Sequence, residues 1–213
     1  MADYVSIANL AASKLGEDDQ LRSPDDDTHL GRSVKAVYDM VRRAAIRGYT
    51  WNFASRRAEL PAEDLPSIPY PWQSSFPLPA DSVRLVKVLN RASRSDYQVE
   101  GRSILTNGLG PLYIRYLIDV PEPALWDDLF VEAFASRLAF QIADRITGDR
   151  GRKADAWSDY KNALSEAKKV DALENPQVEQ EPSGWELART SGGDGRPFGY
   201  RVDAAGVWRD PVI

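Results

Sequence analysis

Apolar residues recur at helical spacing in four stretches of the chain. In residues 3–15, valine, isoleucine, leucine and alanine side chains crowd one side, which predicts a short amphipathic helix ending at Gly16. A second helix is expected to begin at an N-cap, Asp26 or Asp27, and to run without a break to about Arg47.

Two further helices are expected after residue 120. Pro121 and Pro123 introduce the third, ALWDDLFVEAFASRLAFQIADRIT, whose wide apolar stripe predicts burial on more than one side. The fourth, from about Lys153 to Leu173, is much more polar. Its only substantial apolar stripe is Trp157, Tyr160, Ala163, Leu164 and Ala167.

The pattern changes between Tyr49 and about Val120. Prolines at 61, 66, 69, 71, 77 and 79 exclude long helices from the first part of this segment. Runs typical of β-strands lie between the turns: RRAEL, SVRLVKVL, DYQVEG, RSILTN and LYIRYLIDV. We therefore expect an antiparallel β-insert of about four short strands.

The segment after Glu174 is rich in proline and glycine and has hardly any continuous apolar run. It cannot bury enough surface to form a core alone. Four aromatic residues are nevertheless spaced along it like anchors: Trp185, Phe198, Tyr200 and Trp208. The favoured interpretation is an arm that docks on a partner subunit or another protein, and the alternative is a tail that wraps its own domain or stays loose.

These patterns together predict an α+β protein, mainly a bundle of about four helices with an antiparallel β-insert and an extended C-terminal arm. The expected parts are the N-terminal helices of the bundle over 1–50, the β-rich insert over 51–120, the C-terminal helices over 121–174 and the arm over 175–213.

Composition narrows the class of protein. The 213 residues include 32 acidic and 27 basic side chains, for a formal net charge of −5, whereas a protein that grips DNA along its whole surface should be basic. The absence of cysteine excludes disulfides, thiolate zinc sites and thiol nucleophiles. Neither a signal peptide nor a membrane span is recognisable, so we expect a soluble protein without membrane contact.

One cluster of polar residues invites a metal interpretation. Asp25, Asp27 and His29, the sole histidine, alternate along the chain. A helix-loop-helix calcium loop needs glycine and glutamate where this chain has Leu30 and Ala36, and zinc would need further nitrogen or sulfur ligands. Acidic groups at a helix N-terminus explain the cluster better, so no metal site is expected.

No pattern predicts catalysis. Asp127 and Asp128 are neighbours at a helix start and point to different sides, so they cannot work as a paired acid and base. The glycine-rich SGGDGRPFG lacks the lysine and Ser/Thr of a phosphate loop, and no serine stands in a nucleophile elbow. We expect a protein that is not an enzyme and uses no cofactor.

The stretch RGYTWNFASRRAEL, residues 47–60, mixes arginines with aromatic rings. If the chain after Gly48 is extended, Trp51 and Phe53 share one face and can cover the junction between the helices and the β-insert. The alternative is a nucleic-acid surface, with rings exposed beside arginines. The acidic composition supplies no basic groove elsewhere, so packing is the favoured interpretation.

Several motifs occur in an order that resembles one known family. They are NLAASKLGE, WNFASRRAEL at 51–60, SFPLPADSVRLVKV, LYIRYLIDV and WDDLFVEAFASRLAFQIA. Over about residues 4–170 this order is similar to the tail tubular protein A family, the head-to-tail adaptor (connector) proteins of short-tailed bacteriophages. The segment beyond Glu174 matches no motif of the family.

The resemblance implies a structural virion protein at the head–tail junction, assembled in the host cytoplasm. Its partners would be further copies of itself in a ring, usually of 12, together with the portal protein and the tail nozzle protein. Double-stranded DNA would pass through the channel during ejection without specific binding. Family members commonly reach the portal with their C-terminal segments, which gives the hypothesis that Trp185, Phe198, Tyr200 and Trp208 contact the portal.

Two other functions stay open at this stage. One is a nucleic-acid-binding or regulatory module that uses the basic and aromatic stretch 42–57. The other is a tail-associated polysaccharide hydrolase, which needs two carboxylates roughly 5 to 9.5 Å apart in a cleft. The sequence has many acids but indicates no pairing between them.

Overall fold

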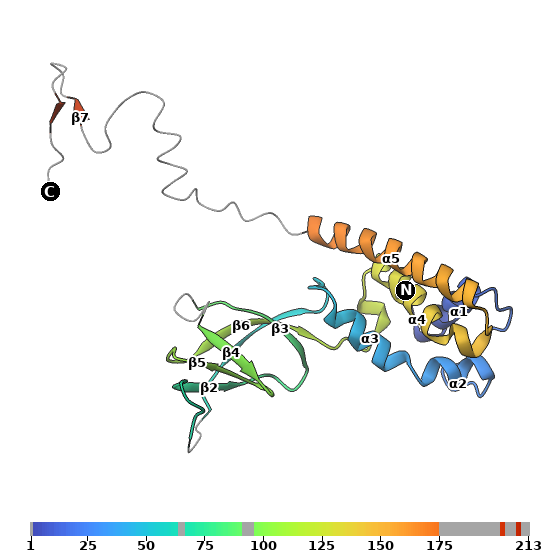
Figure 1. Cartoon of the computed structure of the whole chain (residues 1–213), viewed down its shortest axis with the longest axis horizontal. Helices are drawn as coiled ribbons and strands as arrows, with labels where there is room; N and C mark the ends of the chain where they lie inside the picture. Colours follow the sequence, from blue (N-terminus) through green and yellow to red (C-terminus); the bar gives the residue numbers. More distant parts are fainter. Residues whose placement is uncertain (1, 64–66, 91–95, 175–200, 203–207, 210–213) are drawn as a thin grey trace. The chain divides into compact units, whose positions relative to one another are not determined.

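A computed structural model describes residues 2–63, 67–90, 96–174, 201–202 and 208–209 (Figure 1). The chain divides into two compact units, residues 1–174 and residues 175–213. The first unit contains helices packed around a shared apolar core and a β-structure with a core of its own.

The described helices are α1 (Tyr4–Lys14), α2 (His29–Lys35), α3 (Tyr38–Arg47), the 3₁₀ turn η1 (Pro123–Leu125), α4 (Asp128–Ile146) and α5 (Arg150–Leu173). The predicted first helix is confirmed. The Asp3 side chain accepts a hydrogen bond from the Ser6 backbone N–H at 2.7 Å, which caps the start of α1. Gly16, with φ of 67°, turns the chain away after its end.

The prediction of one unbroken helix up to Arg47 is wrong. Thr28, and not an aspartate, caps α2 by accepting from the Gly31 backbone N–H at 3.0 Å. The chain then bends at Ala36 and Val37, and α3 begins at Tyr38. Val34 of α2 and Val41 of α3 are both buried in the helical core, so the bend does not remove either helix from it.

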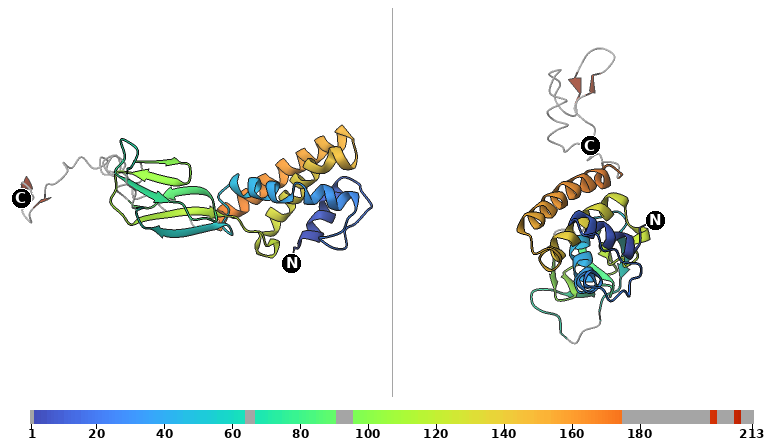
Figure 2. Two further views of the ribbon diagram at one scale, coloured as in Figure 1. Left: turned by 90° about the horizontal axis from the view of Figure 1, so that it is seen from below. Right: turned by 90° about the vertical axis from the view of Figure 1, so that its right-hand side faces the viewer.

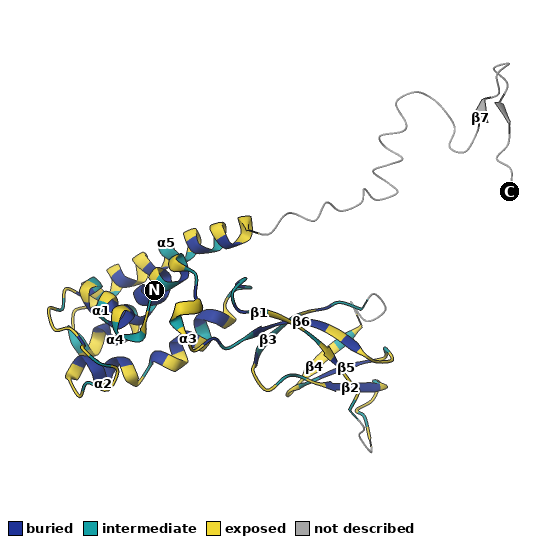
Figure 3. Cartoon of the chain, turned by 180° about the vertical axis from the view of Figure 1, so that it is seen from behind, coloured by how far each residue is buried: buried dark blue, intermediate teal, exposed yellow. Residues whose placement is uncertain are grey.

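Helix α4 is the centre of the helical part, with α5 on one side and α1, α2 and α3 also packed against it. Buried residues lie on most sides of α4, so the prediction of a helix buried on more than one side is confirmed. It begins later than predicted, because Asp127 accepts from the Leu129 and Phe130 backbone N–H groups and fixes the first turn there. Helix α5 keeps an exposed outer face along its length, as its polar sequence predicts (Figure 3).

The β-structure consists of two antiparallel three-stranded sheets, in the orders β1-β6-β3 and β2-β5-β4 (Figure 2). Their strands are β1 (Ser55–Leu60), β2 (Ser74–Pro77), β3 (Ser82–Val88), β4 (Tyr97–Glu100), β5 (Ser103–Thr106) and β6 (Leu112–Ile118). All five predicted runs form strands, and β2 was missed, so the expectation of about four strands was too low. Mixed helix and strand with antiparallel sheets is confirmed as the fold class.

Strand β6 belongs to both cores of the first unit. On one face, Leu112 and Ile114 pack with Phe76 and Ile104 of the other sheet. On the opposite face, Leu117 is fully buried in the helical core. The period-two alternation of a strand therefore directs Leu112 and Ile114 into the β core, and Leu117 from the opposite face into the helical core.

Of the second unit, the described residues form two short strands, β7 (Arg201–Val202) and β8 (Trp208–Arg209), which pair antiparallel. The rest of the predicted arm, including Trp185, Phe198 and Tyr200, lies outside the described residues. Trp208 is the first residue of β8, opposite Val202.

Candidate functional site: the aromatic joint

Five aromatic residues meet where the helices join the sheet formed by β1, β6 and β3. We call this cluster the aromatic joint: Tyr49, Trp51, Phe53, Trp126 and Phe130. The Phe130 ring lies at its centre, with centroids 4.8 Å from Trp51, 4.9 Å from Phe53 and 5.3 Å from Trp126. Most pairs are tilted or edge-to-face, the arrangements that aromatic rings prefer.

The segment that carries Trp51 and Phe53 is a turn and not the extended strand that the sequence suggested. The Ser55 backbone N–H donates to the Asn52 carbonyl at 3.2 Å, and the Ser55 hydroxyl donates to the Trp51 carbonyl at 2.8 Å. Trp51 is completely buried, and its indole N–H donates to the Ala45 carbonyl near the end of α3 at 3.2 Å. The turn still places both rings on one side, stacked 6.1 Å apart.

An ion pair secures the joint beside the rings. Arg42 on α3 is 8% exposed and donates to both carboxylate oxygens of Asp119 at 2.9 Å each. Its third contact is to Asp39, at 2.6 Å. The hydrogen bonds with Asp119 raise the pKa of Arg42 further, so it stays charged. Since Asp119 directly follows β6, this pair ties the helical part to the sheet.

The end of α5 is fastened to the same turn by a buried carboxylate. Asp171 accepts from the Asn52 backbone N–H at 2.9 Å, and the Asn52 side chain donates to the Asp171 carbonyl at 2.8 Å. Burial raises the pKa of the Asp171 carboxyl. Tyr49 contributes a second tie, because its hydroxyl donates to the Lys168 carbonyl at 3.2 Å.

The arginines of the basic and aromatic stretch serve different roles. Arg42 is buried in the ion pair, and Arg47 donates to the Val83 carbonyl at 2.5 Å. Arg43, Arg56 and Arg57 are exposed. No base could stack on Trp51 without opening the core, since none of its surface reaches solvent.

The aspartates considered for a metal or catalytic site have structural roles instead. Asp27 pairs with Arg32 at 2.7 Å and Asp25 with Lys35 at 3.3 Å, on the exposed surface around α2. Asp127 caps α4. Within the described ranges of the chain, no group of three or more histidine, cysteine, aspartate or glutamate side chains could hold a metal ion.

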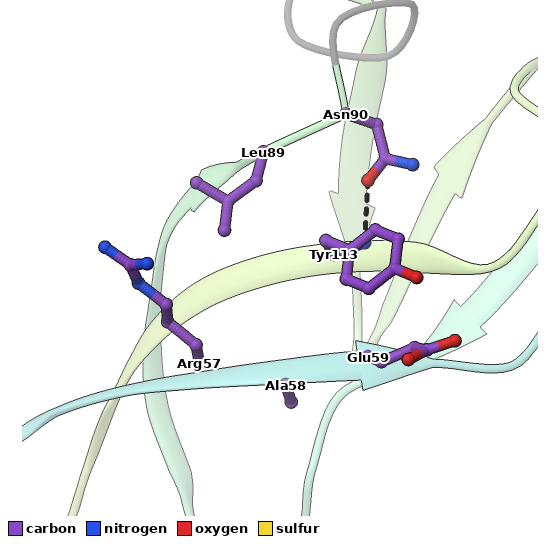
Figure 4. Close-up of a pocket in the computed structure, with 6 residues that line it drawn as sticks. All are labelled: Arg57, Ala58, Glu59, Leu89, Asn90 and Tyr113. Carbon is purple, nitrogen blue, oxygen red and sulfur yellow. Dashed lines mark hydrogen bonds between the residues drawn. The ribbon is translucent and has the colours of Figure 1, made fainter.

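A hollow of about 500 Å³ lies on the outer face of the sheet formed by β1, β6 and β3 (Figure 4). Arg57, Glu59, Leu89, Asn90 and Tyr113 line it. The Asn90 side chain accepts from the Tyr113 backbone N–H at 2.6 Å and so continues the pairing of β3 with β6. The hollow is a shallow depression in the sheet surface. Glu59 is the one acid among the described residues that line it, and no second carboxylate faces it there to form an acid–base pair.

Sequence reasoning identified Trp51 and Phe53 but missed Arg42, Asp119 and Asp171 as parts of the same structure. Arg42 and Asp119 are 77 positions apart, and Asn52 and Asp171 are 119 apart. Neither pair has a local spacing that could reveal it. The one available signal was the position of Asp119 directly after the apolar run of β6.

The helices described by the structure include none that is long and apolar enough to cross a membrane. Comparison of the chain with known protein families found no match, and comparison with curated proteins found none.

Proposed function

We propose that this protein is a structural head-to-tail adaptor of a tailed phage. In this function, copies of the chain form a ring beneath the portal, continue the DNA channel and offer a docking surface to the tail nozzle. The proposal joins the family resemblance over about residues 4–170 to the arrangement of the aromatic joint.

The observation that carries the proposal is where the resembling motifs lie. WNFASRRAEL supplies Trp51 and Phe53, LYIRYLIDV supplies Leu117, and WDDLFVEAFASRLAFQIA supplies Trp126 and Phe130. All five residues belong to or pack against the helical core at the joint. The motifs therefore specify how two parts of a scaffold are held together, which is what a ring subunit under mechanical load requires, and not a reaction centre.

The acidic balance of the chain supports passage of DNA without adhesion. With 32 acidic against 27 basic side chains, little net attraction to phosphates is expected. The competing nucleic-acid function makes an opposite prediction that is simple to measure. Duplex binding by the purified chain should be weak at about 0.15 M salt, whereas a dedicated binder with several phosphate contacts would show a steep dependence of affinity on salt.

A ring subunit must bury two different surfaces, one against each neighbour. We expect the purified chain to be largely monomeric or mixed in size, and to close into a ring when portal protein provides a template. Analytical ultracentrifugation with and without portal protein tests this. A stable two-fold dimer at all concentrations would contradict it.

The second unit is proposed to bind the portal through its aromatic residues. Removal of residues 175–213 leaves the first unit with both of its cores, so this variant should remain folded. Co-sedimentation of the full chain with portal protein should be strong, and that of the shortened chain should be lost. Equal co-sedimentation of both would refute the role of the second unit, and no co-sedimentation of the full chain would refute the adaptor function.

A further inference from the structure

A partly apolar groove lies between α4 and α5. We call it the α4–α5 groove: Phe140, Arg150, Lys153, Ala154 and Trp157, enclosing about 290 Å³. Trp157 is 41% exposed although its ring lies 4.9 Å from that of Phe140. Adjacent aromatic rings that line a groove and stay partly open to solvent are a feature of protein interfaces.

Two cations, Arg150 and Lys153, line the groove, and the exposed Asp144 pairs with one of them. Lys153 lies over the Phe140 ring, with its amino group 5.1 Å from the centroid, and also contacts Asp144. Arg150 is exposed at the first position of α5. Arg137 extends the positive side, 5.5 Å from the centroid of Tyr160, the next ring along. The groove thus has aromatic rings at its floor and cations at its edge. Such a groove can bind an acidic segment that carries a small apolar residue, because the acids face the cations and the apolar residue covers the rings.

The same chain carries such a segment. Residues 17–27, which we call the acidic loop, contain six acidic residues and one arginine, for a formal charge of −5, equal to that of the whole chain. Pro24, Asp25 and Asp27 are exposed in it. The side chain of Asp25 is 88% exposed, and that of Asp27 is 85% exposed.

The acidic loop is held in one shape. Asn9 pairs with the backbone of Leu21, accepting from its N–H at 2.8 Å and donating to its carbonyl at 3.0 Å. Asp26 accepts from the Arg22 and Ser23 backbone N–H groups at 2.6 and 3.0 Å and folds the loop back on itself. A loop that is already ordered loses little conformational freedom on binding.

The acidic loop and the groove belong to the same end of the helical part. Arg152, on the first turn of α5, donates to the carbonyl of Leu15, two residues before the loop. The loop and the groove are made of different residues, so one copy can offer its loop to one neighbour and its groove to the other. Such use of two different surfaces is what a heterologous contact requires.

We propose that the acidic loop of one copy docks in the α4–α5 groove of the next copy. Pro24 covers the Trp157 and Phe140 rings, and Asp25 faces the cations of the rim. The contact repeats around the assembly, because each copy offers one loop and one groove. This inference rests on the proposed ring and assigns the surfaces that face each other within it.

The contact can be tested by disulfide cross-linking of the full chain, since the native sequence has no cysteine. Asp25→Cys and Ala154→Cys are made as separate single variants, mixed in equal amounts, assembled on portal protein and oxidised. The mixture should give a disulfide-linked dimer in at least about tenfold excess over an Asp25→Cys and Glu166→Cys mixture. Residue 166 is an exposed α5 position about 18 Å further along the helix and a third of a turn around it. Equal yields from the two mixtures would overturn the proposal.

A charge exchange provides an independent test. Arg150→Glu and Asp25→Lys should each weaken assembly on portal protein, because each places like charges across every junction. When the two variants are mixed, every junction between unlike copies again joins opposite charges. A ring in which the two variants alternate has only such junctions, so assembly should recover to near the native level. Failure of the mixture to recover, while each variant keeps the native melting temperature, would contradict the assigned contact.

The outcomes also separate this contact from the adaptor function. If rings form on the portal but the cysteines at positions 25 and 154 do not cross-link, the adaptor function is supported and the proposed interface is refuted. If duplex DNA and not a second copy protects Trp157 from fluorescence quenching, the groove binds nucleic acid and the proposal is wrong. The cross-link yield should fall between 0.1 and 1 M salt, as the screening length shrinks from about 10 to about 3 Å.

Discussion

Replacing Trp51 by alanine tests whether the aromatic joint holds the first unit together. Trp51 is fully buried and contacts Tyr49, Phe53 and Phe130. The substitution removes the indole from the middle of the cluster and also the hydrogen bond to the Ala45 carbonyl. The surrounding elements come from distant parts of the sequence, so the cavity cannot close by a local adjustment.

The expected loss of stability follows from these contacts. Truncation of a buried aromatic side chain to alanine costs about 3–5 kcal/mol. Loss of the indole hydrogen bond adds about 1 kcal/mol. For a domain of this size, about 2–4 °C of melting temperature corresponds to 1 kcal/mol, so Trp51→Ala should melt at least about 8 °C lower than the native chain.

The matched control is Trp157→Ala, the same substitution at the 41% exposed tryptophan of the α4–α5 groove. It should lower stability by no more than about 1.5 kcal/mol, because much of its ring already contacts water. Thermal and urea unfolding followed by far-ultraviolet circular dichroism give both values without relying on tryptophan emission. Equal losses in the two variants would refute the assignment of Trp51 to the centre of the joint.

Three further variants examine the ties around the joint and the acidic loop. Asp119→Ala should lower the free energy of unfolding in urea by about 2–4 kcal/mol, because the buried Arg42 loses its main partner. Asp39→Ala should lower it by less than about 1 kcal/mol, because the Asp39 side chain is 80% exposed. Equal losses in the two variants would contradict this ranking. Burial raises the pKa of Asp171, so protonation of its carboxyl stabilises the folded chain at low pH, and this contribution is lost as the pH rises through the raised pKa. Asp171→Asn should therefore be at least as stable as the native chain at pH 7, and this advantage should vanish below about pH 3.9. A stability difference between variant and native chain that favours the variant more at pH 4 than at pH 7 would contradict this. Gly31→Ala should cost about 1–3 kcal/mol by calorimetry, because the added carbon would lie 2.2 Å from the Asp26 carbonyl oxygen, and an unchanged melting temperature would show that the loop is not held as described.

The sequence predicted helices and strands well where the period of the apolar residues agrees with the proline, glycine or capping residues that bound the element. Strand β6 alternates clearly, and α4 has a long stripe behind Pro121 and Pro123, so both were found. Strand β2 was missed because it has only four residues, SSFP, and proline is rare within strands. Its place in a sheet depends on pairing with β5, a tertiary contact that no local pattern shows.

The bend between α2 and α3 could not be read from the sequence for a similar reason. Neither glycine nor proline stands at Ala36 or Val37, and the apolar spacing continues through both. Next to the bend, the Tyr38 ring packs 5.2 Å from that of Phe134 and 4.6 Å from that of Tyr4, contacts that join distant parts of the chain. Such constraints appear only when distant segments are brought together.

The joint was predicted in part. Adjacent large rings after a helix stop indicated a buried junction, which is how Trp51 and Phe53 were selected. The backbone there is a turn and not a strand, because Ser55 and Asn52 close a hydrogen-bonded loop that the period-two argument does not consider. The pairs of Arg42 with Asp119 and of Asn52 with Asp171 join positions too far apart in sequence for any spacing rule.

Electron cryo-microscopy of virions that contain this chain tests the central claim most directly. The account predicts a closed collar of copies between the portal and the tail, with the aromatic joint in every subunit and the acidic loop of each copy against α5 of the next. Particles in which the chain occurs as isolated copies away from the head–tail junction, or mature particles that lack it, would contradict the account.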